Sequence, residues 1–525
     1  MSKIFLLRAL EKTQSSFMEL EFSFFSLLLT VLVFVFTALK IGKRFKTNET
    51  TLSLPPGPWK LPLIGNLHQL VGSLPHHRLR DLSKRYGPLM HLQLGQVSTV
   101  VVSSPEFAKE VMRTRDVIFA SRPRFLVSEI VAYGSTNIIF SPYGYYWRQL
   151  RKVCISELLS TKRVQSFRSV REEEVSNLIN WIASKEGSPI NFTEKIHSLA
   201  FGITSRAAFG KKRNDQEIFI AVVKEATKLA AGFDFADLFP SIEAIQWISG
   251  TKYQLQKLHQ EIDRILENII KEHQKDKETL EIGKSEESED LVDVLLKVQK
   301  QDDSEFHLTT DNIKAVIFDI FSAGSESSAT TIDWAISELM RNPRLMKKAQ
   351  VEVREVFNRV GNLDETSTGE MKFLKLVIKE TLRLHPAATL IPRECRERCE
   401  IKGFEIPIKT RVVINAWAIG RDPEFWTEPE SFIPERFFDS PIDYKGNNFE
   451  YIPFGAGRRI CPGMSFGLAN IELPLAMLLY HFDWELPNGT KHDNLDMTEA
   501  FGLSVRRKED MYMIPSPYHR SSTSY

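Results

Sequence analysis

The sequence predicts a mainly α protein with a minor β-sheet region, in the α+β class. Long stretches with apolar residues at i, i+3 and i+4 fill the second half of the chain and are typical of amphipathic helices. Two short segments rich in β-branched residues interrupt them and predict strands. The 525 residues are 42% hydrophobic, which allows a large core and excludes a wholly disordered protein.

An uncharged apolar run stands near the amino end. No residue from Phe22 to Leu39 is charged, and as a helix this run would span roughly 27 Å, close to the thickness of a bilayer core. Basic residues follow the run and acidic residues precede it, so the positive-inside rule places the rest of the chain in the cytosol. A cleaved signal peptide is the alternative, but the run is long and its basic cluster lies on the wrong side. We expect a single-pass anchor.

These features divide the chain into four parts. Residues 1–21 form an N-terminal extension, either a weak organelle presequence or, as we favour, residues upstream of a start at Met18. Residues 22–39 are the transmembrane anchor, and residues 40–58 form a basic and Pro-rich linker whose prolines hold the backbone extended. Residues 59–525 form one catalytic domain, because no change in composition divides them.

Within this body the strands are expected at 93–103 and 403–414, where β-branched residues lie beside turn signals. A stretch crowded with Lys, Glu and Ser, residues 275–290, is expected to be a solvated loop. Apolar periodicity predicts helices at 170–184, 217–231, 253–274, 311–340, 344–359 and 370–385, and a last helix from Met464 to Tyr480.

Charge and cysteine content narrow the classes of function. Lys plus Arg is 68 and Asp plus Glu is 67, so the net charge of +1 gives no general field for nucleic acid. Four cysteines are too few for a disulfide scaffold and fit a reducing compartment. Cys395 and Cys399 lack a second ligand pair, so zinc is not expected there.

The candidate chemistry lies around Cys461. This cysteine belongs to the glycine-rich loop FGAGRRICPG, residues 454–463, directly before the last predicted helix. The amide groups at a helix start, together with Arg459, are expected to depress the pKa of the thiol below the usual value of about 8.5. A lone loop cysteine is more often a small buried hydrophobe, but glycines at 457 and 463 indicate that something bulky and flat approaches the backbone.

The loop matches F-x-x-G-x-R-x-C-x-G, and the chain therefore resembles the cytochrome P-450 monooxygenases from Leu54 to its carboxyl end. This resemblance implies the cytochrome P-450 fold with an N-terminal transmembrane helix. It implies haem b (heme b, iron protoporphyrin IX) with Cys461 as the axial iron ligand. By the same resemblance Phe454 packs near the sulfur, Arg459 binds a haem propionate, and Gly463 belongs to the cofactor loop.

Three further motifs carry the resemblance. In the first, Glu380, Arg383 and Arg436 form a buried network that supports haem insertion, where an exposed ion pair would be the alternative. In the second, Trp147 and Arg151 share a helix face and contact the haem propionates, as does Arg393. Arg148 and Lys152 then point away, either to dock an electron donor or as a solvated basic face.

The third motif is Ala323-Gly-Ser-Glu-Ser-Ser328, which resembles the family pattern A/G-G-x-D/E-T-T/S. Ala323 and Gly324 leave room for oxygen beside the helix, and Glu326 with Ser327 would deliver protons. Ser327 departs from the usual threonine, so its hydroxyl lacks a β-methyl that would restrict its rotamer. The alternative is a polar patch inside a helix.

The electron supply is expected from outside the chain, which has no G-x-G-x-x-G or G-x-x-x-x-G-K-[ST] motif. The resemblance implies an NADPH-cytochrome P-450 reductase, through which NADPH and flavins act indirectly, and cytochrome b5 as a second candidate partner. It also implies membrane lipid, a small lipophilic substrate and residence in the endoplasmic reticulum membrane.

The sequence most resembles plant A-type members that act on terpenoids, through segments such as PPGPWKLPLIGN, KETLRLHP and AWAIGRDP. We therefore expect hydroxylation of a sesqui- or diterpenoid, with an alkaloid or a phenolic compound as the alternative. Substrate contacts are expected near Phe119 to Ile139, Phe219 to Phe239, Phe321 to Ser327, Ala387 to Ile391, and Phe501 to Leu503. More distant alternatives are a peroxide-rearranging enzyme and a haem-binding protein without turnover, which would not need Glu326 and Ser327.

Overall fold

The computed structural model describes residues 30–31, 53–211, 216–230, 234–279, 289–300, 306–361 and 364–518. The predicted anchor at 22–39 lies outside the described residues, apart from the helical Thr30 and Val31, and so do the extension at 1–21 and the linker up to residue 52. Within the described ranges, no helix has the length and apolar character needed to cross a membrane.

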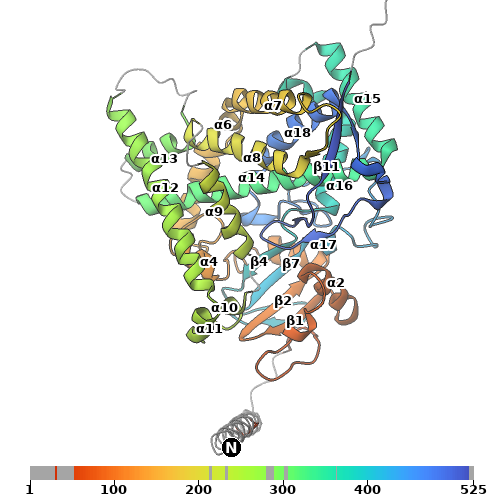
Figure 1. The fold of residues 1–525 in the computed structure, drawn as a ribbon. Helices are drawn as coiled ribbons and strands as arrows, with labels where there is room; N and C mark the ends of the chain where they lie inside the picture. The colour runs from red at the N-terminus through yellow and green to blue at the C-terminus, as the bar shows by residue number, and fades with distance from the viewer. Residues whose placement is uncertain are drawn as a thin grey trace, which may run out of the picture.

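Helices form most of the body, as expected, and the sheets are small (Figure 1). The longer helices are α2 (Pro75–Tyr86), α5 (Tyr145–Val153), α7 (Arg168–Ala183), α8 (Phe192–Phe209), α9 (Gln216–Leu229), α12 (Thr251–Thr279), α13 (Leu291–Lys300), α14 (Thr310–Arg341), α15 (Pro343–Val360), α16 (Lys372–Leu384) and α18 (Met464–His481). The shorter ones are α3 (Pro105–Lys109), α4 (Leu126–Ile130), α6 (Thr161–Ser166), α10 (Phe235–Leu238), α11 (Glu243–Ile248) and α17 (Ala416–Ile419).

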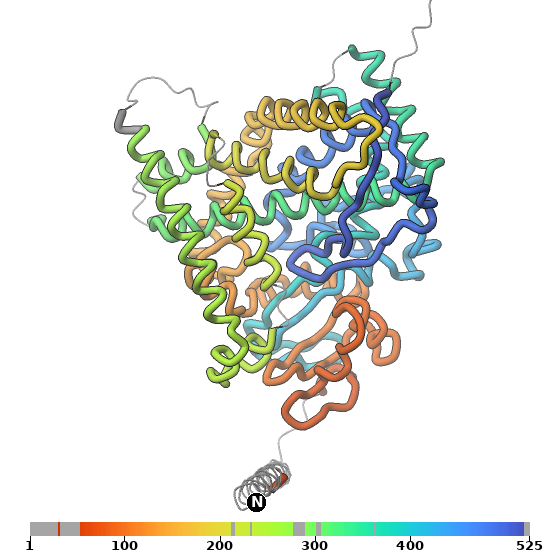
Figure 2. Tube along the Cα trace, viewed as in Figure 1, coloured from red at the N-terminus to blue at the C-terminus, as the bar shows by residue number. Residues whose placement is uncertain are grey.

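The main sheet has the strand order β1-β2-β7-β4. Strand β2 pairs parallel with β7, and the other two pairings are antiparallel. Figure 2 shows how this brings an early part of the chain beside a late one. The strands are β1 (Leu89–Leu94), β2 (Val97–Val102), β4 (Leu390–Glu394) and β7 (Arg411–Asn415), and the small sheets hold β3 (Ile190–Asn191), β5 (Cys399–Ile401), β6 (Phe404–Ile406), β8 (Phe482–Glu485), β9 (Glu499–Ala500), β10 (Arg506–Arg507) and β11 (Tyr512–Pro517).

Both predicted strands are broken by turns. The segment 93–103 contains the end of β1, a turn at Gly95 and the whole of β2, because Gly95 takes a φ of 58° that ends the strand. The segment 403–414 holds β6 and most of β7, separated by a turn in which Lys409 has a φ of 63°.

The predicted helices are confirmed to within a few residues at their ends. The predicted loop at 275–290 is wrong at its start, because α12 continues to Thr279. A charged sequence can remain helical there, since its polar side chains need no partner in the core. Residues 280–288 of that segment lie outside the described ranges.

Helix α14 runs through the centre of the body (Figure 1). Its start is fixed by Thr309 and Asn312, whose side chains each accept a hydrogen bond from the other's backbone N–H. One hydrophobic core contains its later residues, such as Ile332 and Leu339, and another contains its earlier residues, such as Ile317. The helix therefore belongs to both cores and gives the site near its middle a rigid wall.

The Pro-rich segment before the body lies against β1. The backbone N–H of His91 donates to the carbonyl of Pro56 at 2.8 Å. A Cβ added to Gly57 would lie 2.0 Å from the carbonyl oxygen of His91, so no larger residue fits there. This end of the linker is therefore fixed to the sheet.

Glu380 ties α16 to the segment that follows α17. Nε and Nη2 of Arg383 donate to the two carboxylate oxygens of Glu380, both at 2.8 Å. Arg436 Nε donates to Oε1 of Glu380 at 3.0 Å. The side chains of Glu380 and Arg383 are fully buried. Arg383 Nη1 also donates to the carbonyls of Gly420 and Pro429, both at 2.7 Å. The predicted association of these three side chains is present.

We expect Glu380→Ala to lower the free energy of unfolding by about 3–5 kcal/mol, because two buried guanidinium groups lose their anion. Urea unfolding followed by circular dichroism measures this change. The matched control is Glu370→Ala, since Glu370 pairs with Arg359 at a site where their side chains are 53% and 66% exposed. That change should cost less than about 1 kcal/mol. Equal costs for the two variants would contradict the role assigned to burial.

Candidate active site

The loop that carries Cys461 is shaped by its glycines and by backbone hydrogen bonds. The N–H of Cys461 donates to the carbonyl of Phe454 at 2.9 Å. Gly457 has a φ of 68°, and a Cβ there would lie 2.0 Å from the carbonyl oxygen of Met112. Only glycine therefore allows this turn. Helix α18 begins three residues after the cysteine, as the sequence predicted.

The electrostatics of the thiol differ from the expectation. Burial raises the pKa of Cys461, while a hydrogen bond from the Gly463 N–H and the charge of Arg151 lower it by less. The expected depression of the pKa is therefore wrong for the chain by itself, because desolvation outweighs the helix start. The nearby cation is Arg151 and not Arg459. A bound metal would supply the missing stabilisation of the thiolate.

Four arginines lie together beside this loop, and we call them the arginine cluster: Arg122, Arg151, Arg393 and Arg459. Each donates to at least one backbone carbonyl. Arg459 bonds to Ala120 at 2.7 Å, to Ile138 at 3.3 Å and to Ser141; Arg122 bonds to Ile139 at 3.1 Å and to Pro392; Arg151 bonds to Ile460 at 2.8 Å; and Arg393 bonds to Ala456 at 3.3 Å. The cluster thus fixes several loops at once.

Positive charge accumulates in this cluster beyond what the chain itself neutralises. Burial, and then the charges of Arg122, Arg393 and Arg151, lower the pKa of Arg459 to about 7. Burial likewise lowers the pKa of Arg393 well below its usual value. The carboxylate that opposes them within the described part of the chain is Asp116, whose own pKa is raised by burial.

The fully buried Arg393 has donors to spare. Its Nε and Nη1 are buried and form no hydrogen bond with any described residue. Buried donors without an acceptor are costly, and buried cations even more so. A ligand with two carboxylates would satisfy both requirements. The propionates of a haem have this chemistry, so the residues present fit the cofactor that the sequence predicted.

Trp147, also predicted to contact a propionate, makes a different contact. The indole N–H of Trp147 donates to the carbonyl of Ile138 at 3.1 Å. Its ring lies under the guanidinium of Arg459, whose Cζ is 3.9 Å from the ring centroid. Trp147 therefore supports Arg459 through its face. Arg148 and Lys152 are exposed on the other side of α5.

Phe454 contributes to the loop through its backbone and its ring. Its carbonyl accepts the N–H of Cys461, and its ring lies 5.5 Å from that of Tyr444 in an edge-to-face arrangement. A Cβ at Gly463 would lie 4.0 Å from the sulfur of Cys461. Gly463 can therefore stay beside the thiol without excluding a ligand from it.

Two residues that the sequence did not single out complete this region. Arg122 is the fourth member of the arginine cluster, and it is preceded by Ser121 and followed by Pro123. Asp319 of α14 accepts a hydrogen bond from Asn137 Nδ2 at 2.7 Å and another from the Ile139 N–H at 3.0 Å. Burial raises the pKa of Asp319 to about 7. Asp319 thus holds the segment whose carbonyls the arginines bind.

The middle of α14 faces an open space. Ala323 is exposed although the helix around it is buried, so a void adjoins the helix at this residue. Ser327 Oγ donates to the carbonyl of Ala323 at 2.7 Å, and Ser328 Oγ donates to that of Gly324 at 2.8 Å. A Cβ at Gly324 would lie 3.2 Å from the ring of Phe466. Of the two small residues predicted beside an oxygen site, Ala323 therefore borders a free volume, whereas the space beside Gly324 is taken by Phe466.

Glu326 lies one residue before Ser327 and points toward α8. Its Oε2 is 3.8 Å from Nδ1 of His197, and 14% of its side chain is exposed. Burial raises the pKa of this carboxyl, and the charges of Lys224 and Arg506 oppose that rise. A carboxyl with a raised pKa keeps its proton at a higher pH than an ordinary glutamate, which suits a proton donor.

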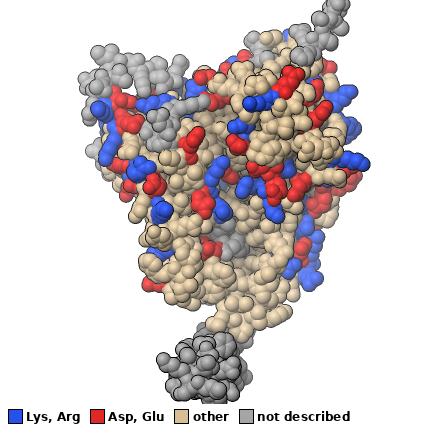
Figure 3. Space-filling model, in the orientation of Figure 1, with Lys and Arg blue, Asp and Glu red and all other residues tan. Residues whose placement is uncertain are grey.

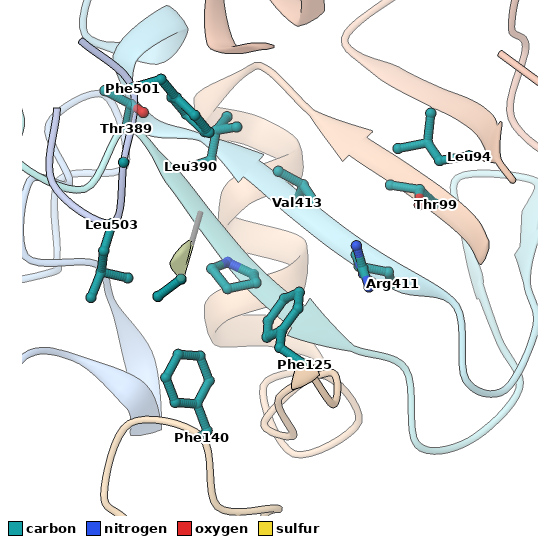
Figure 4. A pocket seen from close by; sticks show the side chains of 13 residues that line it. Leu94, Thr99, Phe125, Phe140, Thr389, Leu390, Arg411, Val413, Phe501 and Leu503 are labelled. Atoms are coloured by element: carbon teal, nitrogen blue, oxygen red, sulfur yellow. The ribbon is translucent and has the colours of Figure 1, made fainter. Parts of the chain in front are cut away.

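A cavity of about 610 Å³, including the part open to solvent, lies between the sheet and the loop 501–503 (Figure 4). Its lining is mainly apolar, from Phe125, Phe140, Ala230, Leu390, Phe501 and Leu503. These residues fall in or next to the segments expected to contact substrate. Thr99, Arg411 and Val413 come from β2 and β7, which the sequence did not place at the cavity.

A second hollow adjoins the first, because Phe140, Ala230 and Leu503 line both. Its other lining residues include Phe318 and Ser322 of α14, which lie five residues and one residue before Ala323. The two hollows together connect the sheet side of the cavity with the part of α14 that carries the candidate proton donors.

The loop 501–503 is held by Glu499. Its Oε2 accepts hydrogen bonds from His76 at 2.7 Å and from His77 at 2.8 Å, and its Oε1 lies 3.3 Å from Trp417 Nε1. These contacts hold the pKa of Glu499 well below its usual value despite its burial. The ring of Phe501 stacks 5.8 Å from that of His76. One carboxylate therefore fastens the cavity wall to α2 and α17.

Comparison with known proteins places this geometry in context. The sequence model of the cytochrome P450 family matches residues 55–514. The chain is 58% identical to cytochrome P450 71D11 of Lotus japonicus, over 91% of this chain and 98% of that protein. It is 54% identical to tabersonine 16-hydroxylase 1 of Catharanthus roseus (96% and 100%) and 51% identical to premnaspirodiene oxygenase of Hyoscyamus muticus (95% and 99%).

Among solved structures, a zebra fish cytochrome P450 with abiraterone superposes with a TM-score of 0.71. The alignment covers 85% of this chain and 99% of that one, at 24% sequence identity. This likeness concerns the fold.

We expect Arg393→Met to weaken haem retention roughly 10- to 100-fold, because a hydrogen bond to a charged group contributes about 1.5–3 kcal/mol. The rate of haem transfer to an excess of apomyoglobin measures this loss. Arg398→Met is the matched control, since Arg398 lies on the same segment with its side chain 68% exposed. Equal transfer rates in Arg393→Met and the wild type would show that the spare donors of Arg393 face no anion.

Proposed function

Because the chain belongs to the cytochrome P450 family of monooxygenases, we propose that it hydroxylates a lipophilic plant metabolite, most simply a sesqui- or diterpenoid, with O₂ and electrons from NADPH. The observation that carries this proposal is the position of Cys461 beside an arginine cluster with spare donors. A haem bound through this thiolate would supply the activation of O₂.

The chain's own residues have distinct parts in this proposal. Cys461 would hold the haem iron through its sulfur, and it is positioned by the Phe454 carbonyl and the Gly463 N–H. Arg151, Arg393 and Arg459, together with Arg122, would bind the propionates, and Trp147 supports Arg459. Glu380, Arg383 and Arg436 are structural, because they join α16 to the segment before the cysteine loop.

Proton delivery falls to α14. Ala323 keeps the space beside the helix free, and Ser327 turns its hydroxyl along the helix to the Ala323 carbonyl. Glu326 stands behind Ser327 with a raised pKa, so it carries a proton at a higher pH than an ordinary glutamate. Serine has fewer constraints on its rotamer than threonine. We therefore expect looser control of water here.

Electrons are proposed to come from a membrane-bound NADPH-cytochrome P450 reductase, with cytochrome b5 as a second donor. Arg148 and Lys152 support this, because they are exposed on α5 while Arg151 of the same helix bonds to the carbonyl next to Cys461. A basic surface one helix away from the cofactor is suited to an acidic donor.

The cavity supports a lipophilic substrate. Its lining offers phenyl rings and aliphatic side chains in the positions that Figure 4 labels, which favours a hydrocarbon skeleton. The relatives divide between two chemistries, since one is named for premnaspirodiene and another for tabersonine. A terpenoid is our first choice, and an alkaloid or a phenolic compound is the alternative.

A location in the endoplasmic reticulum membrane, with residues 22–39 as a single-pass anchor and 59–525 as a cytosolic domain, is also proposed. The described surface near residue 53 supports it. Trp59, Leu63 and Val71 are exposed there, and Trp247 and Ile248 are exposed on α11. Gly95 lies between the two groups. Its N–H donates to the Ile64 carbonyl, and a Cβ added to it would lie 2.6 Å from the Leu238 carbonyl oxygen and 2.9 Å from the ring of Phe239. Figure 3 shows few charges at this end.

We expect Cys461→Ser to abolish the red-shifted band of the reduced, carbon monoxide-bound protein, since a serine hydroxyl does not supply a thiolate. A reduced carbon monoxide difference spectrum measures this. Cys154→Ser is the control, because Cys154 is buried and lies outside the loop. An unchanged spectrum in Cys461→Ser would refute the assignment of the ligand.

We expect microsomes that contain this protein and a reductase to convert at least one sesqui- or diterpene hydrocarbon into an alcohol when NADPH is added. A panel of terpenoids, alkaloids and phenolics, analysed by mass spectrometry, tests the substrate class. Turnover of alkaloids alone would overturn the terpenoid assignment and leave the monooxygenase in place. Conversion of an added peroxide into product in the absence of NADPH would favour a peroxide-rearranging enzyme.

A further inference from the structure

His197 of α8 faces Glu326 of α14 across the tightest helix contact in the body. The side chain of His197 is 7% exposed, and its Nδ1 lies 3.8 Å from Glu326 Oε2. No described residue accepts or donates a hydrogen bond at this Nδ1. A small rotation of the Glu326 side chain would close the distance to a hydrogen bond.

Other buried histidines of this chain have a local structural partner. The Nδ1 of His273 lies 2.8 Å from the Ile269 carbonyl, and the Nε2 of His91 lies 3.0 Å from the Ser98 hydroxyl. His76 and His385 also have an Nδ1 without a hydrogen bond to any described residue, but the Nε2 of each lies within 2.8 Å of a glutamate oxygen. The Nδ1 of His197 lies 3.8 Å from the carboxyl of Glu326. Packing alone does not require a polar ring at this position.

Three charged side chains near His197 and Glu326 are exposed, while the pair itself lies deeper. Lys224 of α9 and Arg506 of β10 are exposed and act on both His197 and Glu326, while Asp510, also exposed, acts on His197. Lys224 Nζ lies 5.5 Å from the ring of Phe201, one turn along α8 from His197. Burial and these two cations lower the pKa of His197 to about 3, so its imidazole is neutral at physiological pH.

We infer that His197 is a positioning residue for Glu326: its Nδ1–H stabilises the carboxylate that remains after Glu326 gives up a proton toward Ser327. This inference rests on the proposed function, because it gives Glu326 a partner for the proton delivery described there.

The proton balance is simple. Without substrate, O₂ takes two electrons from NADPH and two protons and becomes hydrogen peroxide. The Ser327 hydroxyl passes its own proton toward the oxygen as it takes the proton of Glu326, which becomes a carboxylate. A proton from solvent then restores Glu326. His197 neither gains nor loses a proton in this cycle, and the electrons come from NADPH through the reductase. A neutral donor lowers the pKa of the carboxyl without adding a charge.

The experiment compares His197→Phe, His197→Asn and His197→Gln in the full chain with reductase. The amide nitrogen of asparagine lies where Nδ1 lies, whereas that of glutamine lies where Nε2 lies, so only asparagine keeps the donor facing Glu326. Thr204→Val is the control, because Thr204 is a buried residue of α8 whose hydroxyl donates to the Ala200 carbonyl at 2.8 Å. NADPH oxidation and hydrogen peroxide release without added substrate are measured across a range of pH.

In His197→Phe we expect the rate of NADPH oxidation to fall roughly 3- to 10-fold. This loss is smaller than the rate enhancement of about 10²–10⁴-fold that a positioned acid contributes, because the acid itself remains. Loss of the donor raises the pKa of Glu326, so the falling alkaline limb of the profile moves to higher pH. His197→Gln should behave like His197→Phe, and His197→Asn should keep most of the wild-type rate. If His197→Phe does not fold, the comparison of asparagine with glutamine still decides.

A double variant gives a second criterion. With Glu326→Gln in place, adding His197→Phe should change the rate little, because the two residues act as one unit. The inference would be overturned if His197→Phe and His197→Gln both kept the wild-type rate and pH profile. Additive effects in the double variant would also overturn it. A wild-type protein with no carbon monoxide band and no NADPH oxidation would instead overturn the proposed function.

Discussion

The site depends on holding four guanidinium groups side by side, with Arg393 and Arg459 buried and Arg122 and Arg151 partly buried. Such groups repel one another, and each must find acceptors inside the protein. The chain provides them as backbone carbonyls from segments that are far apart in sequence, among them Ala120, Ile138 and Ile460. The loops take their paths because these carbonyls must point inward. An anion with two carboxylates would complete the arrangement and would convert an electrostatic cost into a selective cofactor site.

Helix α14 contributes stiffness to the same region. Its hydroxyl side chains at 325, 327, 328 and 331 each donate to the carbonyl four residues earlier. Such bonds compete with the regular backbone ladder and often bend helices. The two ends of the helix are fixed in separate hydrophobic cores, so they limit how far these bonds can bend its middle.

Much of the fold and of the site could be predicted from the sequence. The helices follow from apolar periodicity, and the loop of Cys461 is specific enough to identify the centre of the site. The turn inside 93–103 could have been recognised from Gly95, whereas the residue type of Lys409 does not signal the positive φ that turns the chain between β6 and β7. Arg122 and Asp319 escaped because their partners are distant: Arg122 bonds to Pro392, 270 residues away, and Asp319 to Asn137, 182 residues away. The pKa of Cys461 was misjudged because the extent of its burial depends on the whole fold.

The fastening of the cavity wall by Glu499 has a consequence for how such an enzyme diversifies. The residue that holds the wall is separate from the residues that touch the cavity, Phe501 and Leu503. Replacements at those two positions can reshape the space for ligands while the backbone path stays the same. Selectivity can therefore drift over generations at little risk to foldability, which makes this short loop a natural place for new metabolic specialisations to arise.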